Sequence, residues 1–186
     1  QQTVALPSCG FRYTTNQGGA VSKGFDLQGE WLPIDNLDLD FSLGYTDAHY
    51  TSTSASAGLV LANPGDKLPG SPWSFSLGAQ YTATVMGLDS FARVDYEYAS
   101  REIGLTPDRD NSTTLFDGGL EPEPTTNVVK IRAGATVRKV DLALFVDNLF
   151  NAHPQLGLNH QDSDTLLYEA TTLRPRTFGL TATYRY

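Results

Sequence analysis

Apolar and polar side chains alternate with period two in stretch after stretch of this chain, and this pattern constrains its fold most strongly. Successive side chains of a β-strand point to opposite faces, so each such stretch presents one apolar and one polar face. Seven stretches show the pattern: residues 25–31, 37–46, 73–81, 92–98, 129–138, 142–147 and 178–186, with Phe145 interrupting one polar face. The chain is therefore predicted to be all-β and antiparallel, and the residues before Pro7 leave open the end of an eighth strand.

The connections between these stretches alternate in length. Three are tight turns, around residues 34–36, at Met86–Gly87 and at Lys139, and three are long, near residues 50–71, 104–126 and 151–173. Loops of roughly twenty residues are unusual inside a compact soluble domain. Short turns at one end and long loops at the other are typical of an outer-membrane β-barrel, whose short turns face the periplasm and whose long loops are extracellular.

Alternation alone also fits a soluble sandwich or meander with one wet face. Three features favour a membrane: the apolar face of the seven stretches carries no charge, the stretches approach the length of a tilted membrane strand, and aromatic residues gather near their ends. An interfacial girdle would contain Trp31, Tyr45, Trp73, Tyr96, Tyr98, Tyr184 and Tyr186. A transmembrane antiparallel β-barrel is therefore the favoured fold, and an apolar run long enough for a membrane helix is not found.

Charge and composition exclude several classes of function. The formal net charge is −8 and the isoelectric point is about 4.7, which argues against a nucleic-acid surface because phosphate binding needs clustered Lys and Arg. The single cysteine, Cys9, cannot close a disulfide within the chain. No secretion signal is recognisable, so we expect the chain to begin inside a larger protein.

Sequence motifs for catalysis and metal binding are weak. The nucleotide-binding glycine motifs, the serine-hydrolase elbow and the zinc-protease motif are all missing from the sequence. His49, His153 and His160 are scattered without ligand spacing, and residues 108–112 lack the glycine and glutamate of a calcium loop. We therefore expect neither catalysis, nor a metal site, nor a cofactor.

Five segments carry a resemblance to a known family. Residues 142–151 (LALFVDNLFN), followed by residues 174–180 (RPRTFGL) and the terminal Tyr-Arg-Tyr, closely resemble the last two strands of TonB-dependent receptors. Residues 15–24 running into residues 25–30 resemble the glycine-marked start of a descending strand in this family, and residues 67–72 (KLPGSP) fit the start of another. The resemblance touches most of the chain and is greatest to receptors of proteobacteria such as sphingomonads.

The resemblance implies a barrel of about 22 strands with a plugged lumen. Residues 1–186 would then be the C-terminal part of a single barrel domain, without its plug, its N-terminal strands or the short motif that binds the energy-coupling protein. Seven strands cannot close an even-numbered barrel, and open edges are not tolerated in lipid, so the missing strands must come from elsewhere.

The implied function is uptake of a scarce, bulky solute, such as a siderophore, cobalamin or a saccharide. Its partners would be outer-membrane lipid and lipopolysaccharide, the plug, the TonB–ExbB–ExbD energy complex acting through the plug, and the transported small molecule. The resemblance also implies a C-terminal signal for the barrel-assembly machinery, carried by Phe178, Leu180, Ala182, Tyr184 and Tyr186.

Candidate solute-binding residues lie in the predicted long loops: Tyr50, Arg109, Asp110, Phe116, His153, His160 and Tyr168. The charges on the polar faces either pair across strands or contact the plug or the solute path; these are Arg93, Asp95, Glu97, Lys130, Arg132 and Arg138. The alternative is a small stand-alone barrel or a soluble β-meander that acts as an adhesin or binding module. A long upstream reading frame with a signal, a plug and more alternating strands would separate the two hypotheses.

Overall fold

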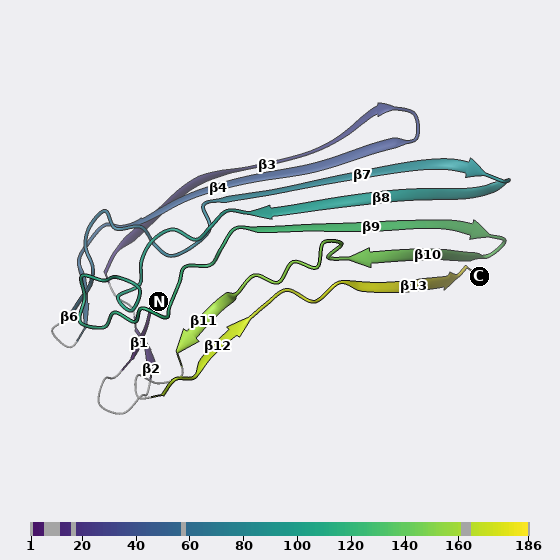
Figure 1. Ribbon diagram of the computed structural model, residues 1–186. Coiled ribbons are helices and arrows are strands. Elements are labelled where there is room, and N and C mark those ends of the chain that lie inside the picture. Colours follow the sequence, from purple (N-terminus) through teal and green to yellow (C-terminus); the bar gives the residue numbers. More distant parts are fainter. Residues whose placement is uncertain (1, 6–11, 16–17, 57–58, 161–164, 186) are drawn as a thin grey trace.

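A computed structural model describes residues 2–5, 12–15, 18–56, 59–160 and 165–185. Its main element is a seven-stranded antiparallel sheet in the order β13-β10-β9-β8-β7-β4-β3, in which each strand is paired with its neighbour in this series (Figure 1). The strands are β3 (Ala20–Ile34), β4 (Leu37–Tyr50), β7 (Trp73–Val85), β8 (Leu88–Ala99), β9 (Thr126–Val137), β10 (Val140–Asp147) and β13 (Thr177–Tyr184). The seven strands predicted from alternation are confirmed.

Several strands extend beyond the alternating stretches. β3 begins five residues before the predicted position 25, and β8 begins at Leu88 rather than at residue 92. The start of β8 was missed because Phe91 lies on the polar face and breaks the pattern. At the other end of the chain, β13 ends at Tyr184, and the predicted girdle residue Tyr186 lies outside the described residues.

The three tight turns are confirmed at one end of the sheet. Met86 and Gly87 both have positive φ, 52° and 78°, which is the backbone of the two-residue turns that match the twist of a β-hairpin. Asn36 (φ 72°) and Arg138 (φ 59°) supply the left-handed residues of the other two turns. These turns lie at the end of the sheet opposite the long connections (Figure 1).

Three small hairpins that alternation did not reveal lie outside the main sheet, one before β3 and two in the long connections. They are β1 (Gln2–Ala5) with β2 (Arg12–Thr15), β5 (Ser54–Ser56) with β6 (Leu59–Ala62), and β11 (Leu156–His160) with β12 (Tyr168–Thr171). Strands this short, two of the hairpins with a register shift, give too few alternating residues to detect. The open question of an eighth strand is also resolved: β1 ends before Pro7 but pairs with β2 and not with the main sheet.

Cross-strand register joins the seven apolar faces into one continuous surface. Leu77 in β7 lies opposite Phe41 in β4 and Tyr96 in β8, and Leu144 in β10 lies opposite Leu180 in β13. Because the side-chain period is two, the polar residues of the seven alternating stretches then share the other face. The predicted assignment of the strands to two faces is thus consistent across the whole sheet.

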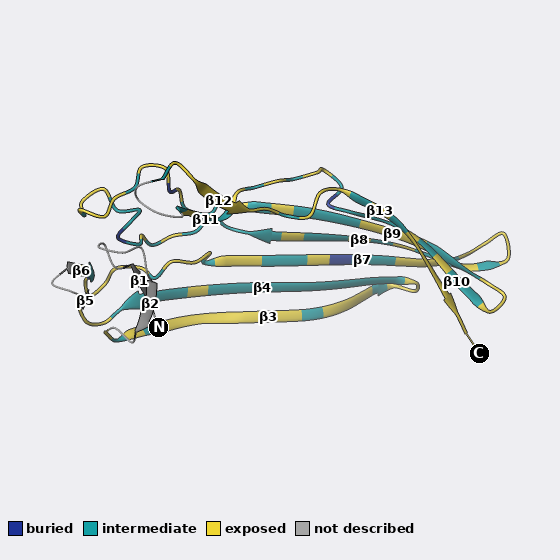
Figure 2. Ribbon diagram, turned by 90° about the horizontal axis from the view of Figure 1, so that it is seen from below, coloured by how far each residue is buried: buried dark blue, intermediate teal, exposed yellow. Residues whose placement is uncertain are grey.

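The sheet is a single layer whose apolar face has no protein cover among the described residues. Among all described residues, only the loop residues Ala62 and Leu120 are buried and hydrophobic. Leu27, Leu144 and Leu180, on the apolar face of the sheet, are each more than half exposed. Figure 2 shows the seven strands coloured almost entirely as intermediate or exposed. A soluble domain buries the apolar face of a sheet against a second layer. An uncovered apolar surface of this extent is what lipid requires of a barrel wall.

Within the described part of the chain, no helix is long and apolar enough to cross a membrane.

Candidate functional site

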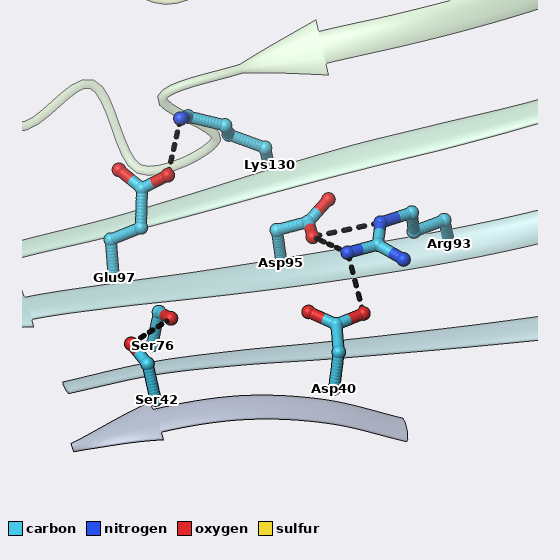
Figure 3. A network of polar contacts seen from close by, with 7 residues as sticks. All are labelled: Asp40, Ser42, Ser76, Arg93, Asp95, Glu97 and Lys130. Atoms are coloured by element: carbon cyan, nitrogen blue, oxygen red, sulfur yellow. Dashed lines mark hydrogen bonds and ion pairs between the residues drawn. The ribbon is translucent and has the colours of Figure 1, made fainter. Parts of the chain in front are cut away.

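The polar face carries an ion-pair network that spans three strands (Figure 3). Arg93 in β8 contacts Asp95 in its own strand at 2.6 Å and Asp40 in β4 at 2.8 Å. Since β7 lies between β8 and β4, the guanidinium must pass over β7 to reach Asp40. Gly78 leaves the space: a Cβ atom there would lie 2.4 Å from both Arg93 Nη2 and Asp40 Oδ2. A side chain at position 78 would therefore displace this ion pair from its position over β7.

Two further contacts continue this network along the polar face. Lys130 in β9 donates to Glu97 in β8 at 2.5 Å, and the hydroxyls of Ser42 and Ser76 lie 2.8 Å apart (Figure 3). Both groups of the Lys130–Glu97 pair are well exposed, so their mutual attraction is worth at most about 1 kcal/mol. Cross-strand pairing, one of the two readings of the charges on the polar face, describes Arg93, Glu97 and Lys130, whereas Asp95 pairs within its own strand.

The structure explains why Phe145 interrupts the polar face of its strand. Its ring lies over Gly179 of β13, where a Cβ atom would be 2.1 Å from Phe145 Cζ. The guanidinium of Arg132 in β9 lies 5.6 Å from the centre of the same ring. An aromatic ring covering a cross-strand glycine fixes the register of the two strands. Phe145 thus joins the last strand to its neighbour on the polar face.

Acidic side chains exceed basic ones on this face. Glu30 in β3 lies directly opposite Asp40 in β4, a like-charge pair that the contact of Arg93 with Asp40 at 2.8 Å helps to offset. Asp38 Oδ1 is buried without a hydrogen-bond partner among the described residues. The charged residues that β3 and β4 themselves place on the polar face are thus all acidic.

A second polar cluster, which we call the loop latch, joins two of the long loops at the other end of the sheet. Asp117 accepts a hydrogen bond from the Tyr168 hydroxyl at 2.7 Å and from the Gly119 backbone N–H at 2.9 Å, and its other oxygen lies 2.5 Å from His160 Nδ1. The rings of His160 and Tyr168 stack, with their centres 4.2 Å apart and their planes at 12°. The latch therefore connects the β8–β9 loop to the β11–β12 hairpin.

Glutamates add a second connection between the same two loops. Glu102 forms an ion pair with Arg109 at 2.6 Å, and both side chains are almost fully enclosed. The same Glu102 oxygen accepts the Glu123 backbone N–H at 3.0 Å, and Glu123 in turn accepts the Gly157 backbone N–H at 2.9 Å. These contacts make the two loops one connected structure.

The structure places the predicted loop residues as follows. His160 and Tyr168 stack on each other in the latch, whereas Arg109 forms an ion pair with Glu102. Asp110 closes a local turn, and hydrogen bonds from the Ser112 backbone N–H and then from its hydroxyl lower the pKa of Asp110. The remaining candidates are separate: Phe116 is about half exposed, His153 contacts the carbonyl of Asn151, and Tyr50 ends β4.

Sequence reasoning missed Asp117, Glu102 and Glu123, the acceptors that organise the loops. No motif marks them, because they lie singly in irregular segments. No group of three potential metal ligands occurs among the residues that the structure describes.

The latch is expected to open at acid pH. Burial alone would raise the pKa of Asp117, but hydrogen bonds from Tyr168, Gly119 and His160 outweigh it and lower that pKa. A lowered pKa means that the ionised latch is fully formed above the ordinary Asp pKa of about 3.9 and is lost as pH falls through the lower folded value. We expect hydrogen exchange in residues 104–125 and 165–171, corrected for intrinsic rates, to stay slow at pH 5 and to accelerate as the pH falls below the ordinary Asp pKa of about 3.9.

The Asp117→Asn variant should show at pH 7 the fast exchange that the native protein shows in acid. Asp110→Asn is the matched control, because Asp110 serves only its own turn. Equal exchange in Asp117→Asn and the native protein at pH 7 would show that the latch does not hold the loops together.

Comparison with known proteins places this geometry in a family. The profile of the family described as "TonB dependent receptor-like, beta-barrel" matches residues 1–149. The fold is similar to the crystal structure of the ferric yersiniabactin uptake receptor FyuA from Yersinia pestis, with a TM-score of 0.68 and 15% sequence identity. That likeness covers 90% of this chain and 24% of the FyuA chain, so the chain spans about a quarter of that receptor's length. No curated protein matches the sequence.

The family assignment agrees with the geometry: one uninterrupted antiparallel sheet, uncharged on one face through its middle and ion-paired on the other. The family implies a β-barrel of the bacterial outer membrane. This chain belongs to the TonB-dependent receptor β-barrel family.

Proposed function

We propose that this sheet is part of the wall of an outer-membrane transporter that takes up a scarce, bulky solute with energy supplied from the inner membrane. The observation that carries the proposal is the division of seven consecutive strands into one uncovered apolar face and one ion-paired polar face. The first face suits contact with lipid and the second suits a water-filled or plugged lumen. Covalent chemistry is not part of the proposed function.

The sheet has two free edges, β3 and β13, which further strands would cover. We place residues 1–186 in the C-terminal part of one barrel domain, whose remaining strands pair with these edges and whose plug fills the lumen. The acidic polar face of β3 and β4 suits a basic plug surface, since Asp40 is paired with Arg93 but Glu30 forms no ion pair with the described residues. The TonB–ExbB–ExbD complex would act through that plug.

The barrel-assembly machinery is the proposed reader of the last strand. Phe178, Leu180, Ala182 and Tyr184 share the apolar face of β13, and Tyr186 lies outside the described residues. Phe178, Leu180 and Tyr184 are each more than half exposed, so they are available to a partner before lipid covers them.

The solute is proposed to bind at the loop end of the sheet. His160 and Tyr168 offer aromatic surface there, next to the carboxylate of Asp117, and Phe116 offers a separate, half-exposed ring in the β8–β9 loop. Iron chelates, cobalamin and saccharides remain the candidate classes. The soluble β-meander is not favoured, because its apolar face would be left in water.

Uptake by cells tests this proposal. Cells with and without the full-length receptor are given 55Fe-loaded siderophores, labelled cobalamin or labelled maltodextrins, each with and without a protonophore. We expect one probe to accumulate only when both the receptor and the proton gradient are present. Accumulation that does not depend on the gradient would contradict energy coupling, and no receptor-dependent uptake of any of the three probes would contradict the proposed solute classes.

A further inference from the structure

The outward, apolar face carries charged side chains at one place, where β3 and β4 extend beyond their apolar stretches toward the long loops. Within the seven strands of the sheet, all of whose residues are described, this face carries charged side chains only at Lys23 in β3 and Asp47 in β4. The two residues lie directly opposite each other in the register. Lys67, from the loop after β4, donates to Asp47 and pairs through its backbone with His49. Two lysines and one histidine thus surround one carboxylate.

Three aromatic rings lie on the same face immediately toward the middle of the sheet. Phe25, Tyr45 and Trp73 come from three adjacent strands, and their ring centres are 5.9 Å (Phe25–Tyr45), 4.5 Å (Tyr45–Trp73) and 6.0 Å (Phe25–Trp73) apart. Phe25 and Trp73 are 50% and 41% exposed, so the ring cluster presents an apolar surface to its surroundings. Phe25 and Tyr45 are each two residues from a member of the charged pair, Lys23 and Asp47.

We propose that this patch, formed by Lys23, Lys67 and the rings of Phe25, Tyr45 and Trp73, is a binding site for the anionic headgroup of an outer-leaflet lipid. Aromatic rings prefer the boundary between acyl chains and headgroups, so a charged group just beyond them lies at headgroup depth. The lipid's acyl chains would lie along the rings, and its phosphate or carboxylate groups would meet the lysines.

Charge complementarity supports an anionic partner. The chain as a whole is acidic, with a net charge of −8, yet lysines outnumber carboxylates in this patch. Lys23 is exposed and forms no ion pair with the described residues, whereas Lys67 is held by Asp47. Asp47 thus orients one lysine and leaves the other for a ligand. This inference depends on the proposed function, because it requires the apolar face to lie in the outer membrane.

The test uses the full-length protein in the neutral detergent octaethylene glycol monododecyl ether. Native mass spectrometry would count bound bisphosphorylated lipid A, with lipid A stripped of both phosphates as the matched lipid. Each lysine near a charged membrane surface contributes about a fivefold effect on binding. We therefore expect Lys23→Gln to weaken retention about fivefold and the Lys23→Gln/Lys67→Gln double variant about 25-fold. Lys139→Gln, in a turn at the other end of the sheet, should bind as the native protein does.

Asp47→Asn separates binding from a merely structural role of this patch. It removes the competing carboxylate and frees Lys67, so lipid A retention should rise, and Lys23→Arg/Lys67→Arg should retain lipid as the native protein does. Native-like retention in the glutamine double variant, or equal retention of dephosphorylated lipid A, would overturn the inference. Displacement of lipid A by millimolar inorganic phosphate would also overturn it, by showing a site for free phosphate.

Each variant would first be checked for outer-membrane fractionation and heat-modifiable gel mobility. A native protein that fails these checks contradicts the proposed function itself. A correctly inserted protein that retains as much lipid A without the two lysines as with them contradicts only the lipid site.

Discussion

Replacing Leu77 with Arg should destabilise the membrane-inserted protein by about 2 to 4 kcal/mol, the cost of an arginine on the lipid face at the middle of a bilayer. Leu77 lies midway along β7 between Trp73 and Tyr81, is 41% exposed and has Phe41 and Tyr96 as its cross-strand neighbours. In this position the guanidinium would displace acyl chains without a carboxylate near it on its own face, since Asp47 lies six residues along β4 from the cross-strand neighbour Phe41. Urea titration of the full-length protein in phosphatidylcholine vesicles measures the loss.

The matched control is Ser76→Arg, one residue away at the same depth. Its side chain points to the polar face, where it contacts Ser42 and lies opposite Glu97. A new arginine there meets a carboxylate and should cost less than about 1 kcal/mol. Equal losses in the two variants would contradict the assignment of the two faces.

Replacing Asn148 with Ala should cost about 3 kcal/mol, although the residue contacts neither lipid nor solute in this account. Asn148 follows β10, is only 5% exposed and has a positive φ of 51°. Its amide nitrogen donates to the carbonyls of Ala152 and Arg174, at 2.8 and 2.9 Å, and its amide oxygen accepts the Ala152 N–H at 2.8 Å. Alanine would leave these buried groups unpaired and would adopt the left-handed backbone less readily.

Asn159→Ala is the control for this experiment. Asn159 is exposed and donates only to the nearby carbonyl of Gly157, so its replacement should change the urea midpoint little. The same titration in vesicles would compare both variants with the native protein. A native-like midpoint for Asn148→Ala would show that the hydrogen bonds of Asn148 do not hold the loop between β10 and β13 in place.

The architecture could be predicted from sequence because lipid imposes a strict pattern. A strand such as β4 must keep Leu39, Phe41 and Leu43 on one face and Asp38 and Asp40 on the other, which leaves the period-two signal intact. The tight turns were equally readable at Met86–Gly87, where the geometry requires a positive φ. The seven strands and their two faces follow from these local rules.

The loop end was less predictable because its structure depends on contacts between distant segments. Asp117 meets Tyr168, 51 residues later in the chain, and no local pattern announces that pairing. His160 and Tyr168 were candidates as loop aromatics, but their stacking on each other came only from the fold. Phe145 interrupts the polar face in the sequence, and its reason, the glycine at position 179 beneath its ring, lies on a strand distant in the chain.

The family motif near the end of the chain has a physical explanation in the same terms. Asn148 and Asn151 both have positive φ, which asparagine adopts more readily than most residues. Asn151 accepts the Arg176 backbone N–H at 3.0 Å, so both asparagines connect the exit from β10 to the return into β13. The two asparagines of this motif therefore hold the last loop against the end of β10 through hydrogen bonds.

The central claim is that one face of the sheet meets lipid and the other does not, and spin labels placed along β7 test it most directly. Single cysteines at residues 74 to 81 of the full-length protein, with its other cysteines replaced, would be labelled in vesicles and probed with oxygen and with a water-soluble nickel complex. We predict that oxygen accessibility peaks at the odd positions, such as residues 75, 77 and 79, and that nickel accessibility is low there. Labels at the odd positions that are open to the nickel complex, or accessibility without a period of two, would contradict the account.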